Sequence, residues 1–547
     1  MIQTPWLTHY PSTLPHTIDP SKYASLVHFM QEAFAHYTHL PMCENMGKVL
    51  TFGAVDRLSK AFAAYMQQHT MLLPGMHVAI QLPNLLQYPI AVLGMLRAGY
   101  VIVNINPQYT PHEMAYQLKD SGARGIVILE NFAHKLVSIL PETAIQTIVV
   151  AKIGDLLGGL KGGFLNFFVK RIKKLVPNYH LPQAVSFKEV LQKGKKALFQ
   201  SVDLKPSDTA FLQYTGGTTG VSKGAVLTHG NVLASLQQME AVIRLKLQES
   251  VERVVMPLPF YHIMGLAGLL IMAKIGASAL LITNPRDIPR FVKALHRYKP
   301  TCLIGISTLF EKLLTNDKFN QLDFSALKLT LAGAMKTQPH LKEKWEKCTG
   351  STLLEGYGLT ECSPGVATDM IDGVHHMPLP GTLVIIADEA GNEVPYGTMG
   401  EILVQGPQVI QSYWNKTLET EQSFVNGWFK TGDIAIMNHD GFISIVDRKK
   451  DMINISGFNV YPNEIEQVLI GHPKVLEVGA IGVEDISLKE AIKVCIVKKD
   501  ASLTAEEIIA YCKEKLTRYK IPKYVEFRNS LPKSPIGKVL RRLLKDK

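Results

Sequence analysis

Short apolar runs alternate with helix-like segments along most of the chain. Four such runs are rich in β-branched residues and predict strands, at 78–82, 101–104, 125–129 and 279–282. This alternation favours parallel sheets covered by helices. After about residue 450 the elements shorten, and we expect a helix at Pro462–Ile470, a strand at Ile492–Lys498 and a helix at Ala505–Leu516. The pattern predicts an α/β chain with a small α+β module at its C-terminus.

The most apolar stretch, Ile263–Thr283, is a candidate membrane span. We expect no span there, because Lys274 lies in its middle, where a charge is costly in a bilayer. A buried helix followed by a strand explains the same run. Met1–Pro20 has neither a basic start nor an apolar core, so we expect no signal peptide.

The composition agrees with a large folded protein. The chain has 547 residues, of which 46% are hydrophobic and 19% charged. This length suggests two to four domains, and the composition excludes intrinsic disorder. The six cysteines are scattered without a CxxC pair, so we expect reduced thiols rather than a disulfide framework or a structural zinc site.

The net charge of +11 is unevenly distributed. Residues 151–200 carry ten Lys and Arg against two acids, and residues 513–547 carry twelve against three. We expect no nucleic-acid partner, because no recognition module accompanies these basic regions. Anionic cofactors or anionic lipid explain them better.

Within the first basic region, Leu160–Val176 (LKGGFLNFFVKRIKKLV) has the pattern of an amphipathic basic helix. Aromatic and aliphatic residues fall near one face, with basic residues close by: Phe164, Phe168, Ile172 and Leu175, and Lys170, Arg171, Lys173 and Lys174. Two interpretations stay open. The helix lies in the interface of an anionic membrane, or it docks on the core with its lysines in solvent.

The strongest chemical signal is the glycine-rich stretch Tyr214–Ala225 (YTGGTTGVSKGA), which follows an apolar run and precedes a helix-like stretch from Asn231. Its glycines let the backbone approach a ligand closely, and its hydroxyls and Lys223 suit phosphate. It is not the common NTPase loop, because Ser222 and not glycine precedes Lys223.

Three further clusters carry candidate chemistry: Leu354–Pro364 (LEGYGLTECSP), Trp428–Asp433 (WFKTGD) with Ile445–Asp451 (IVDRKKD), and Leu531–Arg542 (LPKSPIGKVLRR). They offer a stacking aromatic, an oxygen ligand for Mg²⁺, partners for ribose hydroxyls and a lysine near the C-terminus. Each alone is also explained by turns, caps or solvated charges.

Together, in this order and spacing, the clusters resemble those of the acyl-adenylate-forming (AMP-binding) enzymes, and within them the bacterial long-chain fatty-acid–CoA ligases. The resemblance runs from about residue 25 to the end. It also rests on Pro257–Gly265 (PLPFYHIMG) and Gly400–Asn415 (GEILVQGPQVIQSYWN). It implies an N-terminal domain (1–448) of helix-covered sheets with a small barrel-like subdomain. It also implies a mobile α+β domain (449–547).

The resemblance implies ATP, Mg²⁺ and CoA as cofactor and cosubstrates. A fatty acid of medium to long chain is activated to acyl-AMP with release of pyrophosphate, and is then transferred to CoA. Two alternatives stay open: an acyl-AMP ligase that serves a carrier protein, and a non-catalytic paralogue that binds acyl groups or nucleotide. We further expect a cytoplasmic enzyme, peripheral on the inner face of the cytoplasmic membrane, and we keep a homodimer as a hypothesis.

Site roles follow from motif position. The resemblance implies that Lys538 bridges carboxylate and α-phosphate, that Thr360 donates to the α-phosphate and that Glu361 binds Mg²⁺. His262 would lie at the acyl entrance. The residues expected to bind β- and γ-phosphates are Thr215, Gly216, Gly217, Thr218, Thr219, Gly220 and Lys223. Those expected around the nucleoside and at the moving domain are Gly333, Ala334, Tyr357, Asp433, Arg448, Lys450 (the hinge) and Gly457 (the pantetheine channel).

The sequence also departs from the family pattern and limits the substrate. Val374–Thr382 (VHHMPLPGT) is shorter than in relatives, which puts the local loop geometry in question. Pro257–Gly265 contains no acid to bind a substrate ammonium, so a plain carboxylate is favoured. The apolar stretches Ile263–Ile271 and Leu303–Phe310 are explained equally by an acyl channel and by ordinary core.

Overall fold

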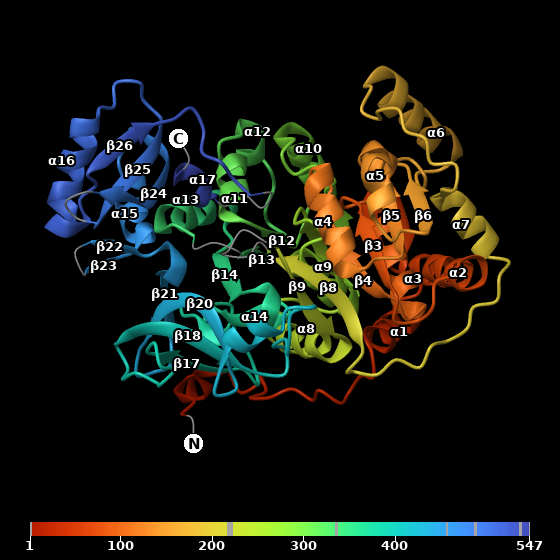
Figure 1. The fold of residues 1–547 in the computed structure, drawn as a ribbon, viewed down its shortest axis with the longest axis horizontal. Helices are drawn as coiled ribbons and strands as arrows, with labels where there is room; N and C mark the ends of the chain where they lie inside the picture. Colours follow the sequence, from red (N-terminus) through yellow and green to blue (C-terminus); the bar gives the residue numbers. More distant parts are fainter. Residues whose placement is uncertain are drawn as a thin grey trace.

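The computed structural model describes residues 3–215, 222–333, 337–455, 458–485, 489–534 and 539–545, with the backbone alone at Phe458 and Lys489. Two large sheets, a smaller antiparallel sheet and a C-terminal α+β unit make up the molecule (Figure 1). The predicted strands at 101–104 and 125–129 and the helix at 462–470 have the expected bounds, and the other predicted elements begin or end within three residues of them.

The first sheet has seven strands, parallel except at the β8–β9 edge. Their spatial order is β7 (Val185–Ser186), β6 (Thr147–Ala151), β5 (Gly125–Leu129), β3 (His77–Gln81), β4 (Val101–Asn104), β8 (Thr209–Thr215) and β9 (Lys223–Thr228). Apolar side chains of α4 (Pro111–Ser121) and α5 (Ala133–Ile139) pack with one face of this sheet. α7 (Phe187–Gly194) packs against α2 (Phe52–His69).

The second sheet has nine strands, with a parallel centre and antiparallel edges. Their order is β16 (Met377–Pro378), β15 (Gly365–Thr368), β14 (Leu353–Gly358), β13 (Leu329–Ala332), β12 (Cys302–Gly305), β10 (Arg253–Met256), β11 (Ser278–Leu281), β1 (Pro41–Asn45) and β2 (Lys48–Thr51). Its outer face packs with α10 (Ile288–Tyr298), α11 (Ser307–Leu314), α12 (Asp317–Asn320) and α13 (Pro339–Thr349).

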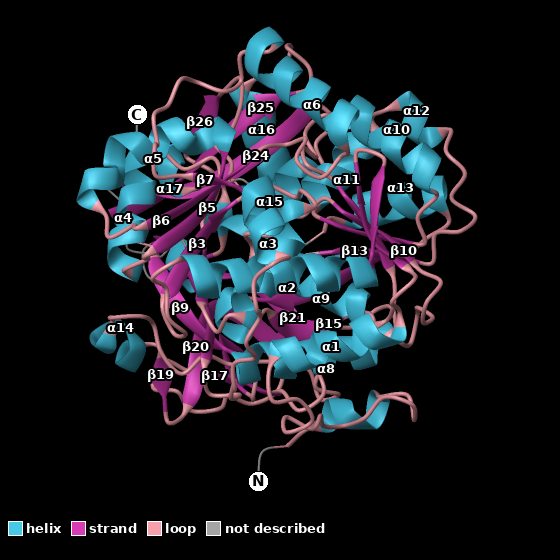
Figure 2. Cartoon of the chain, turned by 90° about the vertical axis from the view of Figure 1, so that its right-hand side faces the viewer, coloured by secondary structure: helices cyan, strands magenta, loops and turns pink. Residues whose placement is uncertain are grey.

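A layer of helices fills the space between the two sheets, as Figure 2 shows. It consists of α1 (Leu26–His36), α2, α3 (Gln87–Arg97), α8 (His229–Ile243) and α9 (Ile263–Lys274). A capping box at Thr228 and Asn231 begins α8. The stretch considered as a membrane span is α9 followed by β11, both buried, as expected. No helix in the described ranges is long and apolar enough to cross a bilayer.

The smaller antiparallel sheet is the barrel-like subdomain implied by the resemblance. It contains β17 (Leu383–Ala387), β18 (Met399–Gln405), β20 (Trp428–Met437), β19 (Phe424–Val425) and β21 (Ile443–Arg448), with α14 (Thr417–Gln422) beside it. Strand β21 leads into a 3₁₀ turn, η6 (Lys449–Asp451), and on to the C-terminal unit.

The C-terminal unit is the small α+β module that the sequence predicts. Its sheet is β24 (Val475–Asp485), β25 (Lys489–Lys498) and β26 (Tyr524–Phe527). Around it lie the hairpin β22 (Ile453–Ile455) and β23 (Phe458–Val460) and the helices α15 (Pro462–Ile470), α16 (Ala505–Lys515) and α17 (Arg542–Lys545). Its apolar side chains form a core cluster of their own.

Candidate active site

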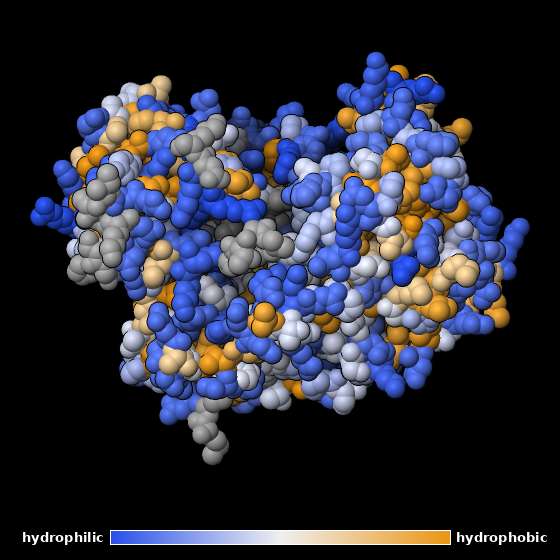
Figure 3. All heavy atoms as spheres, viewed as in Figure 1, coloured by the Kyte–Doolittle hydropathy of each residue, from blue (hydrophilic) through white to orange (hydrophobic). Residues whose placement is uncertain are grey.

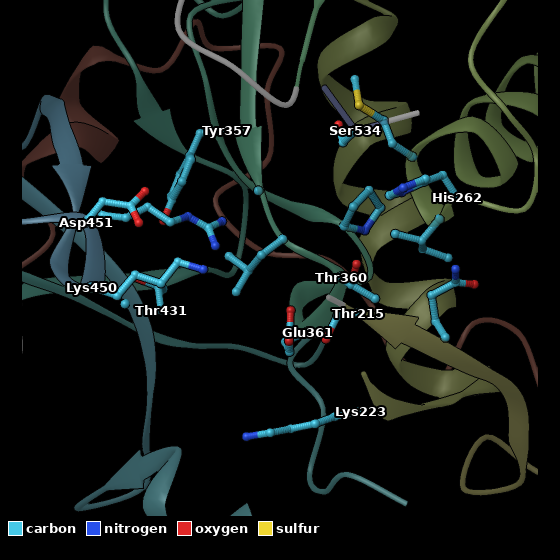
Figure 4. A pocket seen from close by; sticks show the side chains of 18 of the residues that line it. Thr215, Lys223, His262, Tyr357, Thr360, Glu361, Thr431, Lys450, Asp451 and Ser534 are labelled. Carbon is cyan, nitrogen blue, oxygen red and sulfur yellow. The ribbon is translucent and has the colours of Figure 1, made fainter. Parts of the chain in front are cut away.

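A cleft of about 1600 Å³ opens where the two large sheets, the small sheet and the C-terminal unit meet. It is lined at the carboxyl ends of β4, β8 and β14, where α/β folds commonly bind ligands. Figure 4 shows Thr215, Thr360 and Glu361 between His262 on one side and Tyr357 and Lys450 on the other. Residues predicted from separate clusters therefore share one cavity.

One end of this cleft is built by the two adjacent strands β8 and β9. Thr215 ends β8, Lys223 begins β9, and the two residues pair across the strands. The Ser222 hydroxyl donates to the Thr215 carbonyl at 2.7 Å, and the Tyr116 hydroxyl donates to the Ser222 carbonyl at 2.9 Å. Both ends of the glycine-rich loop are thus fixed, and a hydroxyl and an ammonium group face the cleft.

Glu361 lies in the 3₁₀ turn η5 (Thr360–Cys362) and is held by a tyrosine. The Tyr413 hydroxyl donates to a Glu361 carboxylate oxygen at 2.8 Å, and the Lys223 amine lies 5.4 Å from the centroid of the Tyr413 ring. Burial and the Glu361 charge raise the pKa of Tyr413, so the phenol stays protonated. Tyr413 forms an isolated β-bridge with Ala225, so it connects β9 to Glu361.

No pattern in the sequence gives Tyr413 a role. Tyr413 lies in the motif Gly400–Asn415. A single sequence does not show which side chain of that motif points toward Glu361. The contact depends on the isolated β-bridge of Tyr413 with Ala225 in β9, a residue far away in the sequence.

In another part of the site, three of the predicted residues are in direct contact. The Tyr357 hydroxyl donates to Asp433 at 2.8 Å, and Arg448 Nε lies 3.0 Å from the other Asp433 oxygen. Asp433 and Arg448 face each other across β20 and β21. Burial and the Asp433 charge raise the pKa of Tyr357. Gly333 does not line the cleft but is buried under Met264, whose Cε would overlap a β-carbon at that position.

His262 precedes α9 and lines the cleft beside Ile263 and Met264. Burial lowers its pKa, so the imidazole is neutral at neutral pH. Lys450, in η6, also lines the cleft, and burial together with the nearby Arg448 charge lowers its pKa.

Several predicted residues lie outside the described ranges: Gly216, Gly217, Thr218, Thr219, Gly220, Ala334, Gly457 and Lys538. The structure does describe the residues that flank the segment of Lys538. Ser534 and Val539, on either side of the segment that contains Lys538, both line the cleft.

The segment 374–382 contains the edge strand β16 and is held by hydrogen bonds to two neighbouring elements. The side chain of Gln238 in α8 donates to the Pro380 carbonyl at 2.8 Å, and the Ile443 amide of β21 donates to the His376 carbonyl at 3.0 Å. Leu379 lines the cleft. The segment thus joins α8, the nine-stranded sheet and β21.

This site belongs to a known class: the chain is a member of the AMP-binding enzyme family. The model of that family matches residues 30–414, and the model of the AMP-binding enzyme C-terminal domain matches residues 464–538.

Individual relatives cover the whole chain. It is 51% identical to a long-chain-fatty-acid–CoA ligase of Escherichia coli O6:H1, over 99% of this chain and 98% of the relative. It is 45% identical to a long-chain-fatty-acid–CoA ligase of Haemophilus influenzae, with the same coverage. The crystal structure of the anthranilate CoA ligase AuaEII with anthranoyl-AMP matches with a TM-score of 0.84 at 23% identity, over 96% of this chain and 98% of that one. That match confirms the fold class.

Proposed function

We propose that this protein is an AMP-forming ligase that joins a medium- to long-chain fatty acid to CoA at the expense of ATP. The observation that carries the proposal is the 51% identity along the whole chain to a long-chain-fatty-acid–CoA ligase. ATP, CoA and the fatty acid are its substrates.

The reaction has two steps in this proposal. A carboxylate oxygen of the fatty acid attacks the α-phosphorus of ATP, the bond from that phosphorus to the β-bridging oxygen breaks, and pyrophosphate leaves. The CoA sulfur, having lost its proton, then attacks the acyl carbon, and the carbon–oxygen bond to AMP breaks. The first step brings two anions together, so oriented cations and donors matter most.

Several cationic and hydrogen-bonding groups that line the cleft support this proposal. Lys223 and Thr215, with the loop between them, would bind the β- and γ-phosphates, and Thr360 would donate to the α-phosphate. The remaining roles fall to Tyr357 at adenine, Asp433 and Arg448 at ribose, His262 at the acyl entrance and Lys538 at the carboxylate and α-phosphate.

Glu361 fits a magnesium ion bound chiefly through nucleotide phosphates. Mg²⁺ in such sites commonly uses one or two carboxylates, with water and phosphate as its other ligands. Within the described residues no group of three or more acidic, His or Cys side chains could hold a metal ion. A single carboxylate held by Tyr413 suits this mode of binding. When bound, the ion would neutralise phosphate charge.

An apolar part of the cleft supports a fatty acid as the substrate. α8 contributes Met239, Val242 and Ile243, and α9 contributes Ile263 and Met264. By contrast, Leu303, Leu309 and Phe310 are packed in the outer core with α10 and α13, so ordinary core explains Leu303–Phe310. The sequence does not indicate that α8 lines this apolar part of the cleft.

The test is mass spectrometry of the products from purified protein with ATP, Mg²⁺ and acids of four to eighteen carbons, with and without CoA. We expect acyl-CoA and AMP from the longer acids when CoA is present. Acyl-AMP that accumulates whether or not CoA is present would favour a carrier-directed ligase. No product from any acid would favour a non-catalytic binding protein.

We also propose that this enzyme works in the cytoplasm in peripheral contact with anionic membrane through α6 (Gly159–Phe167) and the π-helical turn η4 (Phe168–Ile172). The helix is anchored by Asn166, whose side chain accepts from the Gly154 amide at 2.7 Å. Leu160 is 95% exposed and Phe164 70%. Apolar and hydrophilic side chains are exposed together over α6 at the upper right of Figure 3.

Vesicle sedimentation tests this contact. We expect the protein to pellet with vesicles that contain phosphatidylglycerol, and to bind at least tenfold more weakly after Phe164→Ser and Ile172→Ser or after neutralisation of Lys170 and Lys173. Leu198→Ser removes an equally exposed apolar residue outside this segment and should change nothing. If all variants pellet equally, α6 is an ordinary surface helix that does not bind the membrane.

Two further expectations remain proposals. We place the domain boundary between residues 448 and 449, which is supported by the separate core of the C-terminal unit. The homodimer stays a prediction, and measurement of mass in solution decides it.

A further inference from the structure

Arg541, directly before α17, gathers acidic side chains at the junction between β21 and the C-terminal unit. All five N–H donors of its guanidinium are used. Two contact Glu466 at 3.0 and 2.7 Å, one contacts Asp447 at 3.1 Å, one contacts Asp451 at 3.0 Å, and one contacts the Asn463 side-chain oxygen. Lysine, with three donors on one nitrogen, cannot reproduce this fork.

Asp447 receives a second set of contacts, from the start of a helix. Its side chain is 1% exposed. One carboxylate oxygen accepts from the Asn463 backbone N–H at 2.7 Å, in the first turn of α15. The N-cap residue of α15, Tyr461, makes no side-chain cap hydrogen bond. Asp447 lies in β21 and therefore provides from a separate element the hydrogen-bond acceptor and the negative charge that a helix N-terminus favours.

These contacts divide into two groups. Glu466 and Asn463 lie in α15, in the same C-terminal unit as Arg541, so their contacts with Arg541 move with that unit. Asp447 lies in β21, beside Arg448, on the side of the nucleoside site. The contacts of Asp447 with Arg541 and α15 depend on how the C-terminal unit sits against β21, as does the hydrogen bond from the Asn463 side-chain amide to the Val446 carbonyl at 3.2 Å.

We propose that Asp447 and Arg541 are positioning residues that form a latch, holding the C-terminal unit in the orientation that makes acyl-AMP. The inference rests on the proposed function. In this orientation Ser534 and Val539 line the cleft that also contains His262 and Thr360. Lys538 lies between them in the sequence, so the latch holds the two described flanks of its segment at the cleft.

The latch has a consequence for the second step. If the C-terminal unit turns at Lys450 to admit CoA, Asp447 loses Arg541 and the α15 N-terminus together, whereas the Arg541–Glu466 pair stays intact. Opening the latch is then part of each turnover, and weakening it shifts the balance between the two half-reactions.

Asp447→Asn tests the latch with little change in volume. We expect acyl-AMP formation, followed as pyrophosphate release without CoA, to fall about tenfold or more. Conversion of supplied acyl-AMP and CoA to acyl-CoA should be unchanged or faster. Glu464→Gln is the matched control. It removes one charge from the same helix, but Glu464 pairs with Lys520 at 2.6 Å inside the C-terminal unit, so both half-reactions should persist.

Hydrogen exchange of α15 gives a readout that needs no catalysis. Amides in its first turn should exchange faster in Asp447→Asn and at the wild-type rate in Glu464→Gln. An equal loss of both half-reactions in Asp447→Asn, or unchanged exchange, would overturn the latch. If the wild-type protein forms no acyl-AMP, the proposed function fails, and the exchange measurement still decides the contact.

Discussion

The Tyr413 hydroxyl donates to Glu361 at 2.8 Å, and its ring lies under the Lys223 amine. One side chain thus positions both the carboxylate proposed for Mg²⁺ and the lysine proposed for the terminal phosphates. Replacing its hydroxyl removes a hydrogen bond to a charged group while leaving the ring in place. Such bonds typically contribute about 1.5–3 kcal/mol.

Tyr413→Phe should therefore lower the rate of acyl-AMP formation about tenfold or more and raise the Mg²⁺ concentration needed for half-maximal rate. The measurement is pyrophosphate release across a magnesium series. Tyr298→Phe removes a comparable hydroxyl, which donates to the Ser278 carbonyl at 2.8 Å away from the cleft, and should leave both values unchanged. An unaltered magnesium dependence in Tyr413→Phe would show that Tyr413 does not position Glu361.

At the scale of residues, the sequence predicts contacts between residues of one cluster, but it does not predict contacts between residues of different motifs. Asp433 and Arg448 were expected together at the ribose, and they face each other across β20 and β21. The contacts of Tyr413 with Glu361 and of Arg541 with Asp447 join residues 52 and 94 positions apart. Only the tertiary fold brings such residues together.

At the scale of elements, α8 joins the core to the cleft. One end of the helix contributes Met239, Val242 and Ile243 to the apolar wall. At its other end His229, 2% exposed, accepts from the Leu26 amide of α1 through Nδ1 at 3.2 Å. Burial lowers the pKa of His229 to about 4, because the charged imidazole would lose both water and this acceptor.

Stability should consequently fall as the pH is lowered. Between about pH 6.5 and pH 4 the unfolded chain binds a proton at His229 that the native protein does not, so the free energy of unfolding decreases in this window. The contribution reaches about 2–3 kcal/mol near pH 4.5.

His229→Asn keeps an acceptor but does not titrate. Denaturant unfolding at pH 7 and near pH 4.5 should show a smaller acid-induced loss in the variant, by about 2–3 kcal/mol. The carboxylates that titrate in both proteins act as an internal control. An identical pH dependence in the two proteins would mean that His229 is protonated without penalty in the native state.

Helices and strands with a clear hydrophobic period are predictable from the sequence. How they pack against one another is not. The helix at Pro462–Ile470 appears with its expected bounds. The basic segment predicted as one helix is instead α6 followed by the π-helical turn η4. The apolar stretches at 263–271 and 303–310 look alike in sequence, but only the first has residues that line the cleft among the described ones.

At the scale of the whole molecule, the two large sheets, the small antiparallel sheet and the C-terminal unit all contribute residues to one cleft. The two large sheets line the sides proposed for the phosphates and adenine, the small sheet lines the side proposed for ribose, and the C-terminal unit contributes residues 533, 534 and 539–542 to the lining. The sequence indicates the separate units by shifts in pattern. The angle at which the C-terminal unit meets β21 depends on contacts such as those of Arg541, which no local pattern reveals.

A fatty acid that is activated here as its acyl adenylate leaves one of its carboxylate oxygens on AMP. A long-chain fatty acid labelled with oxygen-18 in both carboxylate positions tests this transfer directly, by mass spectrometry of the AMP and pyrophosphate formed in the presence of CoA. Attack of the carboxylate on the α-phosphorus predicts one labelled oxygen in each AMP and none in pyrophosphate. Unlabelled AMP, or label in pyrophosphate, would contradict the acyl-adenylate account.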